Sequence, residues 1–319
     1  MKLRPLGRSG LQVSPICLGG NVFGWTADEA MSHRLLDAWV EAGGNFIDTA
    51  EAYSNWVPGH TGGESEAVIG RWLAVNGKDG GKRSRVVIAT KCGHPSSKQG
   101  LGREAIRRAI EGSLRRLQTD TIDLYQAHFD DDKTPLEETL SAFAELIDEG
   151  KVRAIGASNY TAPRLAEAIA TSERLGLPRY ESLQPHYNLV ERPVYEDELQ
   201  AVVRDHGIGC IPYFGLARGF LTGKYRSKAD ASKSARGEGA APYLDQPRGR
   251  AVLEALDAVS SNIGAPTAAI ALAWLAARTT ITAPIASATS LEQLQTLVAA
   301  AELSLDAPSV DLLDRASGG

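Results

Sequence analysis

Eight short runs rich in apolar and β-branched residues recur along the chain, separated by longer stretches with helical periodicity. Most of these runs show little polar alternation, which is typical of strands buried on both faces of a parallel sheet. The centres of the first seven lie about 28–41 residues apart, the size of one strand–helix–strand unit. The runs are residues 14–20, 45–50, 85–91, 122–128, 152–158, 180–186, 207–213 and 281–287.

Eight such units favour an α/β fold of the closed (β/α)8 or TIM-barrel type over an open doubly wound sheet, which usually has five or six strands. The gap before the last run, about 73 residues, is too long for one helix. It holds a polar stretch at 227–249 and two helical patterns at about 250–262 and 266–277, so we expect a long loop after the seventh strand beside the active site. The N-terminal segments MKLRPLG and LQVSP predict a β-hairpin that caps one end of the barrel.

Signals for helix ends lie between the runs. Residues 134–137 match a capping box, with Thr134 as the N-cap and proline in the first helical position. Thr161 predicts the start of the next helix, and Gly176 predicts its end. The segment 100–105, GLGREA, superficially matches a dinucleotide-binding fingerprint, but it stands about nine residues beyond the preceding strand and is interpreted as a helix start.

Composition and charge argue against several functional classes. The net charge is −5, and a nucleic-acid binder would need a basic face. No apolar run approaches the ~18–20 residues of a membrane span, and the first residues lack the apolar core of a signal peptide. Cys17, Cys92 and Cys210 lie in or beside apolar runs and are expected to be reduced and buried. We therefore expect a cytoplasmic protein with one domain over residues 1–319, whose oligomeric state the sequence leaves open.

Four polar residues leave three neighbouring runs at the carboxyl ends, where the active site of such a barrel lies. They are Asp48, Tyr53, Lys91 and His128. Each alone has an ordinary structural explanation, but together they suit proton donation to a carbonyl oxygen. A nearby ammonium lowers the pKa of a phenol from about 10, so Lys91 would make Tyr53 a better acid. Asp48 would hold Lys91 protonated, and His128 would orient the substrate oxygen.

Other strand ends offer partners for a nicotinamide. Ser158, Asn159 and Gln184 suit the carboxamide, and Tyr213 offers a flat face for the ring. The six histidines show no metal-ligand spacing with cysteines or carboxylates, so no metal is expected. There is no GxSxG motif of acyl-transfer enzymes.

Taken in order, these motifs resemble the aldo-keto reductase superfamily, from LGRSGLQVSPICLGG near the N-terminus to the helix after residue 290. The segment GLARGFLTGKY is similar to the bacterial and potassium-channel β-subunit branch. The matching segments are NFIDTAEAY (45–53), TKCG (90–93), DLYQAH (123–128), IGASNY (155–160), LQPHYN (183–188), YFGLARGFLTGKY (213–225) and ASATSLEQL (286–294).

The resemblance implies an NAD(P)H-dependent, reversible reductase of aldehyde and ketone carbonyls, acting on small molecules. Tyr53 would be the general acid, and Asp48, Lys91 and His128 would complete a catalytic tetrad. The residues implied for the cofactor are Ser158, Asn159 and Gln184 at the carboxamide, Tyr213 on the ring, and Phe214, Gly215, Leu216, Ala217, Arg218 and Lys224 at the phosphates.

Two departures from the family bear on the choice of cofactor. Ser287 stands where the family usually has glycine, and Ser290 stands at a commonly basic position. No lysine or arginine occurs from 284 to 297, although a 2′-phosphate prefers charge-assisted hydrogen bonds. We expect NADP and leave NAD as an alternative. The groups left for the 2′-phosphate are Ser287, Thr289, Gln293 and Lys224, with Arg226 or Arg236 from the long loop.

Two other functions remain as alternatives. One is a cofactor-binding regulatory subunit with little turnover, which the channel-associated branch suggests. The other is a phosphate-binding barrel isomerase or lyase, which explains the fold but not the tetrad. Trp25, residues 56–60 and the 227–247 loop are candidates for the substrate wall. The sequence identifies neither the substrate nor the preferred direction of reaction.

Overall fold

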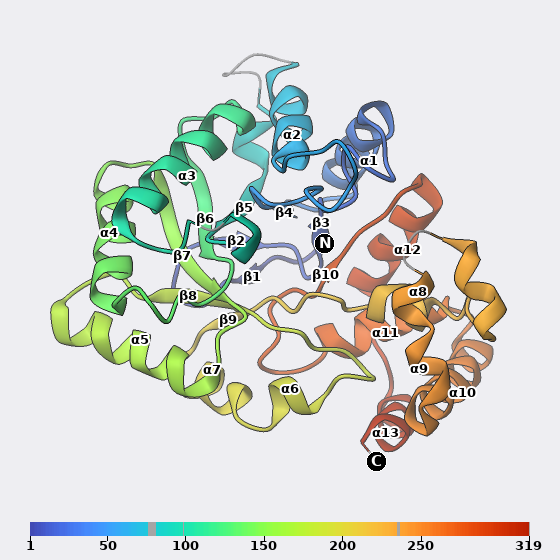
Figure 1. Cartoon of the computed structure of the whole chain (residues 1–319). Helices are drawn as coiled ribbons and strands as arrows, with labels where there is room; N and C mark the ends of the chain where they lie inside the picture. The colour runs from blue at the N-terminus through green and yellow to red at the C-terminus, as the bar shows by residue number, and fades with distance from the viewer. Residues whose placement is uncertain (76–80, 98, 235–236, 319) are drawn as a thin grey trace.

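Eight parallel strands form the (β/α)8 barrel that the spacing of the runs predicts (Figure 1). The computed structural model describes residues 1–75, 81–97, 99–234 and 237–318. The strand order is β10-β3-β4-β5-β6-β7-β8-β9, so each strand pairs with the next along the chain, and β10 returns to β3. The strands are β3 (Cys17–Gly19), β4 (Phe46–Asp48), β5 (Val87–Cys92), β6 (Ile122–Ala127), β7 (Val152–Ser158), β8 (Tyr180–Gln184), β9 (Gly209–Cys210) and β10 (Ile285–Ala286).

Backbone hydrogen bonds close the ring between β9 and the segment that leads into β10. The amide of Thr282 donates to the carbonyl of Cys210 at 2.8 Å, and that of Ile285 donates to Pro212 at 2.8 Å. All six residues of β6 are buried, as expected for a strand covered by helices outside and by the barrel core inside. Both faces of this strand are therefore packed.

Helices surround the barrel in Figure 1 and pack their apolar faces against the outer side of the strands. The short α6 and the C-terminal α13 are additions to the repeating pattern, and α10 with α11 matches the two helical patterns predicted late in the chain. The helices are α1 (Glu29–Glu41), α2 (Glu64–Ala74), α3 (Arg103–Leu117), α4 (Leu136–Asp148), α5 (Ala162–Leu175), α6 (Pro193–Glu196), α7 (Leu199–His206), α10 (Pro247–Ile263), α11 (Thr267–Ala276), α12 (Leu291–Glu302) and α13 (Ala307–Ser317).

Most of the predicted helix ends are confirmed. The Thr161 hydroxyl accepts a hydrogen bond from the amide of Arg164 and so caps α5. Gly176 ends the same helix in the left-handed region, at φ 65°. Gly102 is the N-cap of α3, which confirms that the GLGREA segment starts a helix.

The capping box predicted over residues 134–137 is wrong. Helix α4 begins at Leu136, and Pro135 occupies the N-cap position with an extended ψ of 136°. The Thr134 hydroxyl donates instead to Asp131 Oδ2 at 2.6 Å. Asp131 also accepts the amide of Leu101, so this carboxylate anchors the preceding loop. The extended conformation of Pro135 moves the start of the helix by one residue, so Thr134 lies before the N-cap and its hydroxyl binds the Asp131 carboxylate.

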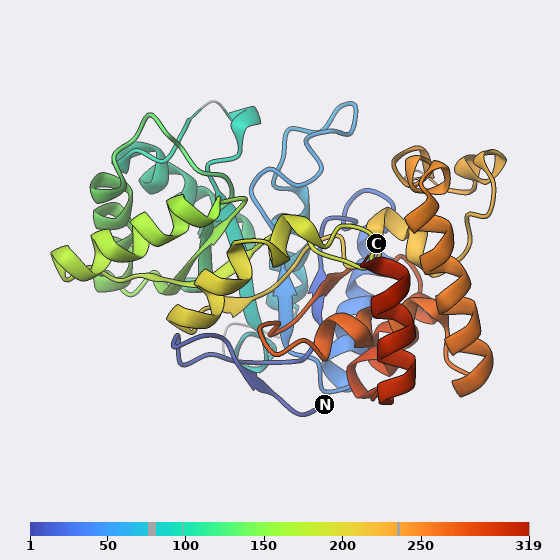
Figure 2. The same ribbon diagram turned by 90° about the horizontal axis from the view of Figure 1, so that it is seen from below.

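The N-terminal hairpin plugs the amino end of the barrel, as predicted. Strands β1 (Arg4–Pro5) and β2 (Gln12–Val13) pair antiparallel. The buried side chains of Leu6 and Leu11 pack into the same apolar cluster as Phe46 at the start of β4. Figure 2 shows the hairpin at the lower end of the barrel, opposite the loops that follow the strands. The carboxyl ends of the strands are thus left to form the site.

The long segment after β9 folds into short helical turns before α10 begins. They are η3 (Ala217–Thr222), η4 (Lys228–Lys233), α8 (Gly237–Ala240) and α9 (Pro242–Asp245). In Figure 2, α8 and α9 lie toward the end of the barrel opposite the hairpin, which confirms the long loop predicted after the seventh strand. Arg236, one of the two loop arginines considered for a 2′-phosphate, lies outside the described residues.

Two further sequence-based expectations concern cysteines and membranes. Cys17, Cys92 and Cys210 are all free and buried, as expected. Burial raises the pKa of the Cys92 thiol well above its usual value, so the thiol packs as a neutral group despite its neighbour Lys91. Within the described ranges, no single helix has the length and apolarity to cross a membrane, and α10 with α11 meets that test only as a pair joined across a 99° bend.

Candidate active site

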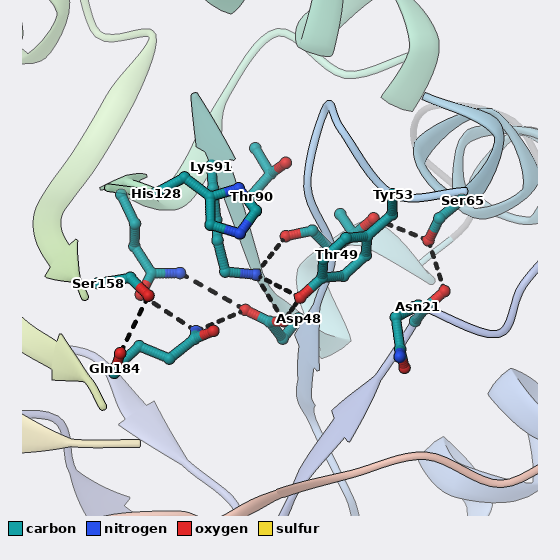
Figure 3. A network of polar contacts seen from close by, with 12 residues as sticks. Asn21, Asp48, Thr49, Tyr53, Ser65, Thr90, Lys91, His128, Ser158 and Gln184 are labelled. Carbon is teal, nitrogen blue, oxygen red and sulfur yellow. Dashed lines mark hydrogen bonds and ion pairs between the residues drawn. The ribbon is translucent and has the colours of Figure 1, made fainter. Parts of the chain in front are cut away.

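The four residues predicted as a tetrad meet at the carboxyl ends of β4, β5 and β6. Lys91 Nζ lies 2.7 Å from Asp48 Oδ2 and 2.8 Å from the Tyr53 hydroxyl. The Tyr53 hydroxyl lies 2.9 Å from the same Asp48 oxygen. The His128 ring centroid is 6.1 Å from that of Tyr53, and Figure 3 shows His128 above the other three side chains. The structure therefore brings all four together.

Lys91 is a fully buried cation whose three ammonium protons all have acceptors. Besides Asp48 and Tyr53, Nζ donates to the carbonyl of Thr49 at 2.8 Å. Burial lowers the pKa of Lys91, while the charge of Asp48 and its hydrogen bond raise it. Asp48 is also fully buried and accepts Gln184 Nε2 at 2.9 Å on its other oxygen. Hydrogen bonds therefore hold both members of the pair, and the Tyr53 oxygen accepts a hydrogen bond from the Lys91 ammonium.

His128 lies above this pair as a neutral imidazole. Desolvation lowers the pKa of His128 well below its usual value, and the positive charges of Lys91 and His94 lower it further. The amide of His128 donates to Cys92 at 2.8 Å, and its carbonyl accepts Asn159 Nδ2 at 2.9 Å, so the backbone is fixed on both sides. Its Nδ1 is buried and has no partner among the residues the structure describes. A neutral imidazole in this setting can donate one hydrogen bond to a substrate oxygen.

A cavity of about 870 Å³ opens above the tetrad. One end has aromatic walls formed by Trp56, His94 and Phe129. Trp25, predicted as part of this wall, packs edge-on behind Trp56, with ring centroids 5.7 Å apart, and does not line the cavity itself. Of the described part of the 227–247 loop, Ser234 reaches the lining.

The other end of the cavity holds the residues that the sequence assigns to a cofactor. Ala217 is the exception, because its side chain is fully buried and does not reach the lining. The predicted residues that line the cavity are Ser158, Asn159, Gln184, Tyr213, Phe214, Gly215, Leu216, Arg218, Lys224, Ser287, Thr289 and Gln293.

Tyr213 is fixed with one ring face toward the protein. His186 stacks on it with a centroid distance of 5.3 Å and an interplanar angle of 12°. The Tyr213 hydroxyl donates to Asn159 Oδ1 at 2.8 Å. Ser158 Oγ in turn donates to the carbonyl of Gln184 at 2.9 Å. These contacts link the ends of β7 and β8 to the segment after β9 and hold the Tyr213 ring in place.

Backbone strain concentrates around the cavity. Six non-glycine residues of the described chain have positive φ, and five of them lie beside the tetrad or in the segments that line the cavity. Three belong to the turn after β9, where Phe214 (φ 55°) is followed by Ala217 (46°) and Arg218 (58°). Left-handed residues cost free energy and cluster at functional sites. The amides of Ala217 and Gly219 donate to the carbonyls of Phe214 and Leu216, so hydrogen bonds within the turn hold this strained conformation.

Among the described residues, two exposed side chains supply positive charge to the cavity lining. Arg218 stacks over the Phe214 ring at 4.4 Å, and Lys224 lies over the Tyr225 ring at 4.9 Å. Arg226, which the sequence suggests as a further cation, is bound by both oxygens of Asp257 at 2.7 Å and does not line the cavity. Its charge is already neutralised by a carboxylate.

At the β10 end the polar side chains are hydrogen-bonded to one another. Ser287 Oγ donates to Asn21 Oδ1 at 2.5 Å. The amide and hydroxyl of Thr289 both point to Gln293 Oε1, at 2.9 and 3.2 Å. Ser290, which stands at a commonly basic position, is the N-cap of α12. Neutral donors and acceptors therefore surround this part of the cavity.

Comparison with known proteins decides the family. The model of the Aldo/keto reductase family matches residues 15–317. The chain belongs to this family. It is 38% identical over 323 residues to the uncharacterized oxidoreductase YrpG of Bacillus subtilis strain 168, covering 98% of this chain and 95% of the relative. It is 33% identical to a probable voltage-gated potassium channel subunit beta of Oryza sativa subsp. japonica, covering 92% and 89%. Protein tas of Escherichia coli K12 is 32% identical, covering 96% and 94%.

Family membership and the relatives' names support an oxidoreductase of carbonyl groups that acts on small molecules and uses a nicotinamide cofactor. The described part of the chain holds no group of three or more histidine, cysteine, aspartate or glutamate side chains placed to bind a metal ion. The site is thus built from the tetrad and the lining of one cavity.

Several contributors to this aldo-keto reductase site were not predicted from the sequence. Gln126 lies next to Lys91 in the β5–β6 register and reaches Asp48 Oδ1 at 3.5 Å. Strand alternation places Gln126 on the same face as His128, so the pattern could have shown it. His186 and its stacking on Tyr213 could not be seen, because the contact joins two loops after different strands.

Ser54, the residue after Tyr53, carries avoidable strain. Its φ is 74°, and its buried hydroxyl has no partner among the described residues. Ser54→Gly removes both costs, and we expect it to raise the free energy of unfolding by about 1 kcal/mol, even after the entropy cost of glycine. Urea denaturation of both proteins measures this difference. A lower denaturation midpoint for the glycine variant would contradict the strain argument.

Proposed function

We propose that this protein is an NADPH-dependent reductase of aldehyde and ketone carbonyls, reversible as an alcohol dehydrogenase, with Tyr53 as the proton donor. The observation that carries the proposal is the hydrogen-bonded set of Lys91, Tyr53 and Asp48 at the floor of the cavity. Tyr53 lines the cavity, whereas the ion pair beneath it is sealed from solvent. This arrangement supports Tyr53 as an acid, because the Lys91 ammonium beneath it stabilises the phenolate that remains.

The four tetrad residues have different roles in the protonation of a carbonyl oxygen. When bound, a reduced nicotinamide supplies hydride to the carbonyl carbon. Tyr53 then turns its hydroxyl proton from Asp48 to the substrate oxygen and transfers it, which completes the alcohol. The Lys91 ammonium stabilises the negative charge that develops on the phenol oxygen, and Asp48 keeps that ammonium charged. Neutral His128 donates a hydrogen bond that orients the oxygen.

The lining fits a dinucleotide in three respects. The exposed face of Tyr213, opposite His186, suits an aromatic ring, and the Gln184 side chain beside it suits a carboxamide. The Arg218 and Lys224 side chains on the lining suit two linked phosphates. We propose the lining residues of the candidate site as the cofactor contacts, in one domain over residues 1–319 of a cytoplasmic enzyme.

NADPH is the proposed cofactor because the described part of the lining carries two cationic side chains, Lys224 and Arg218. Lys224→Met is expected to weaken NADPH binding about tenfold, since a charge-assisted contact is worth roughly 1.5–3 kcal/mol, and to change NADH binding much less. Quenching of protein fluorescence gives both dissociation constants.

Arg226→Met is the matched control, because Arg226 is paired with Asp257 and lies off the lining. We expect it to bind both cofactors like the wild type. Equal losses of NADPH and NADH affinity in the Lys224 variant would argue that Lys224 contacts a group common to both, and the preference for NADPH would lose its support.

The proposed function is tested by cofactor oxidation against a panel of aldehydes and ketones, run in parallel with NADPH and NADH. We expect turnover with at least one class of carbonyl and faster turnover with NADPH. Tight cofactor binding without turnover on any of them would overturn the proposal.

That outcome would favour a second function, a cofactor-binding regulatory subunit. The similarity to the rice protein named as a probable channel subunit is the observation in its favour. The complete set of hydrogen bonds among Asp48, Tyr53 and Lys91 favours catalysis, because a subunit that only senses the cofactor has no need of a buried ammonium below a phenol.

A further inference from the structure

Two threonines flank the buried ion pair and face away from it. Thr49 follows Asp48, and Thr90 precedes Lys91. Because successive residues of a strand point to opposite sides, Asp48 and Lys91 point into the barrel while the threonines point outward, toward α2. Figure 3 shows both threonines beside the tetrad.

The first turn of α2 binds both threonine hydroxyls. Thr49 Oγ1 donates to Ser65 Oγ at 2.8 Å, and Thr90 Oγ1 donates to Glu66 Oε1 at 2.6 Å. Ser65 and Glu66 are adjacent residues, and all four side chains are fully buried. One helical turn therefore contacts the two chain segments that carry the ion pair, through Thr49 after β4 and through Thr90 on β5.

The contacts continue to two more elements. Ser65 Oγ donates to the carbonyl of Gly20, just after β3, at 2.7 Å. Glu66 Oε2 accepts Arg116 Nε, on α3, at 2.7 Å. A buried carboxylate is costly unless it is paired and hydrogen-bonded. Glu66 meets both conditions, and its charge lies close enough to Lys91 to raise the pKa of that ammonium.

We propose that Ser65 and Glu66 are positioning residues, which hold the Asp48–Lys91 pair in register beneath Tyr53 through the hydroxyls of Thr49 and Thr90. This inference rests on the proposed function and extends it to four residues outside the cavity. A small displacement of a reacting group can cost up to about a hundredfold in rate. Loss of one hydroxyl contact is therefore expected to lower kcat and leave KM nearly unchanged.

The first test compares Thr90→Val with Thr90→Ser. Valine has the shape of threonine but no donor, so Glu66 Oε1 loses its partner; serine keeps the donor. We expect kcat to fall about tenfold in the valine variant, with KM and the cofactor dissociation constant within about threefold of wild type. Serine should restore kcat to within about twofold.

Thr139→Val is the matched control for lost stability. Thr139 is also buried and donates from its hydroxyl, to the carbonyl of Leu101 at 3.1 Å, but it lies away from the cavity lining. It should lower the denaturation midpoint, though less than Thr90→Val because its acceptor is a neutral carbonyl, and leave kcat unchanged. If Thr90→Val loses stability but keeps its kcat, the contact is structural and the inference is overturned.

The second test reads Lys91 directly and needs no turnover. The groups acting on its ammonium are Asp48, Tyr53, Cys17, Glu66 and His128. Thr90→Val removes the hydroxyl through which Glu66 holds β5, so Lys91 loses its register with Asp48, the group that raises its pKa, and that pKa is expected to fall; Thr90→Ser should leave it unchanged. NMR titration of the lysine side-chain nitrogens, with Lys91→Met for assignment, measures that shift.

The results separate the two proposals. An unchanged Lys91 titration in Thr90→Val overturns the inference, whether or not the wild-type protein turns over a carbonyl. A wild type that oxidises neither cofactor with any carbonyl overturns the proposed function, and the titration of Thr90→Val then decides by itself whether the Thr90 contact positions Lys91. If the wild type turns over a carbonyl and Thr90→Val has normal turnover and a normal titration, the proposed function stands and the positioning role is removed.

Discussion

Tyr53→Phe is expected to lower kcat by a factor of about 10²–10⁴, the usual contribution of a positioned acid, while cofactor affinity stays within about twofold. The phenylalanine ring keeps the packing against Trp56 and His128 but lacks the proton and the oxygen that Lys91 contacts. Steady-state cofactor oxidation measures kcat, and nicotinamide fluorescence measures binding in the same variant.

Tyr160→Phe is the matched control for this variant. Tyr160 is a buried tyrosine whose hydroxyl lies 3.2 Å from that of Tyr180, and it does not line the cavity. The Tyr160→Phe variant should have a slightly lower free energy of unfolding and the kcat of the wild type. If Tyr53→Phe turned over as fast as Tyr160→Phe, Tyr53 could not be the proton donor, and the mechanism would have to be abandoned.

Lys91→Met is expected to abolish turnover and also to destabilise the fold, by about 3–5 kcal/mol, because it leaves Asp48 as an unpaired buried charge. Both residues are fully buried, and their ion pair measures 2.7 Å. Urea denaturation gives the loss in unfolding free energy, and cofactor oxidation gives the loss in rate.

The double variant Asp48→Asn/Lys91→Met separates the two effects. Replacing Asp48 by asparagine removes the unpaired carboxylate, so much of the free energy of unfolding should be restored. Turnover should stay low, because no ammonium remains to stabilise the phenol oxygen. Recovery of turnover together with stability would show that Lys91 acts only on the fold.

The strands and the tetrad were predictable because their signals are local. Buried runs at regular spacing fix a barrel, and Asp48, Lys91 and His128 each end or follow such a run, so the fold itself brings them together. The positions of helix ends were less predictable. Thr134 lies before the N-cap and donates to Asp131, a partner that the capping pattern does not include.

Contacts between distant segments were not predictable. The stacking of His186 on Tyr213 and the packing of Trp25 behind Trp56 depend on loop conformations that no short motif encodes. The contacts of Ser65 and Glu66 were not predictable either, because in the sequence these residues are typical of the acidic first turn of a helix. Their role becomes visible only when the helix is placed against β4 and β5.

Isotope transfer shows whether hydride passes from the cofactor to the carbonyl carbon. The wild-type protein is incubated with an aldehyde selected from the turnover panel and NADPH that carries deuterium at both positions of nicotinamide C4, and the alcohol is analysed by mass spectrometry and NMR. We predict one deuterium per alcohol, bound to the carbinol carbon. An alcohol formed without deuterium, or NADPH oxidised without alcohol, would contradict direct hydride transfer from the cofactor to the carbonyl carbon.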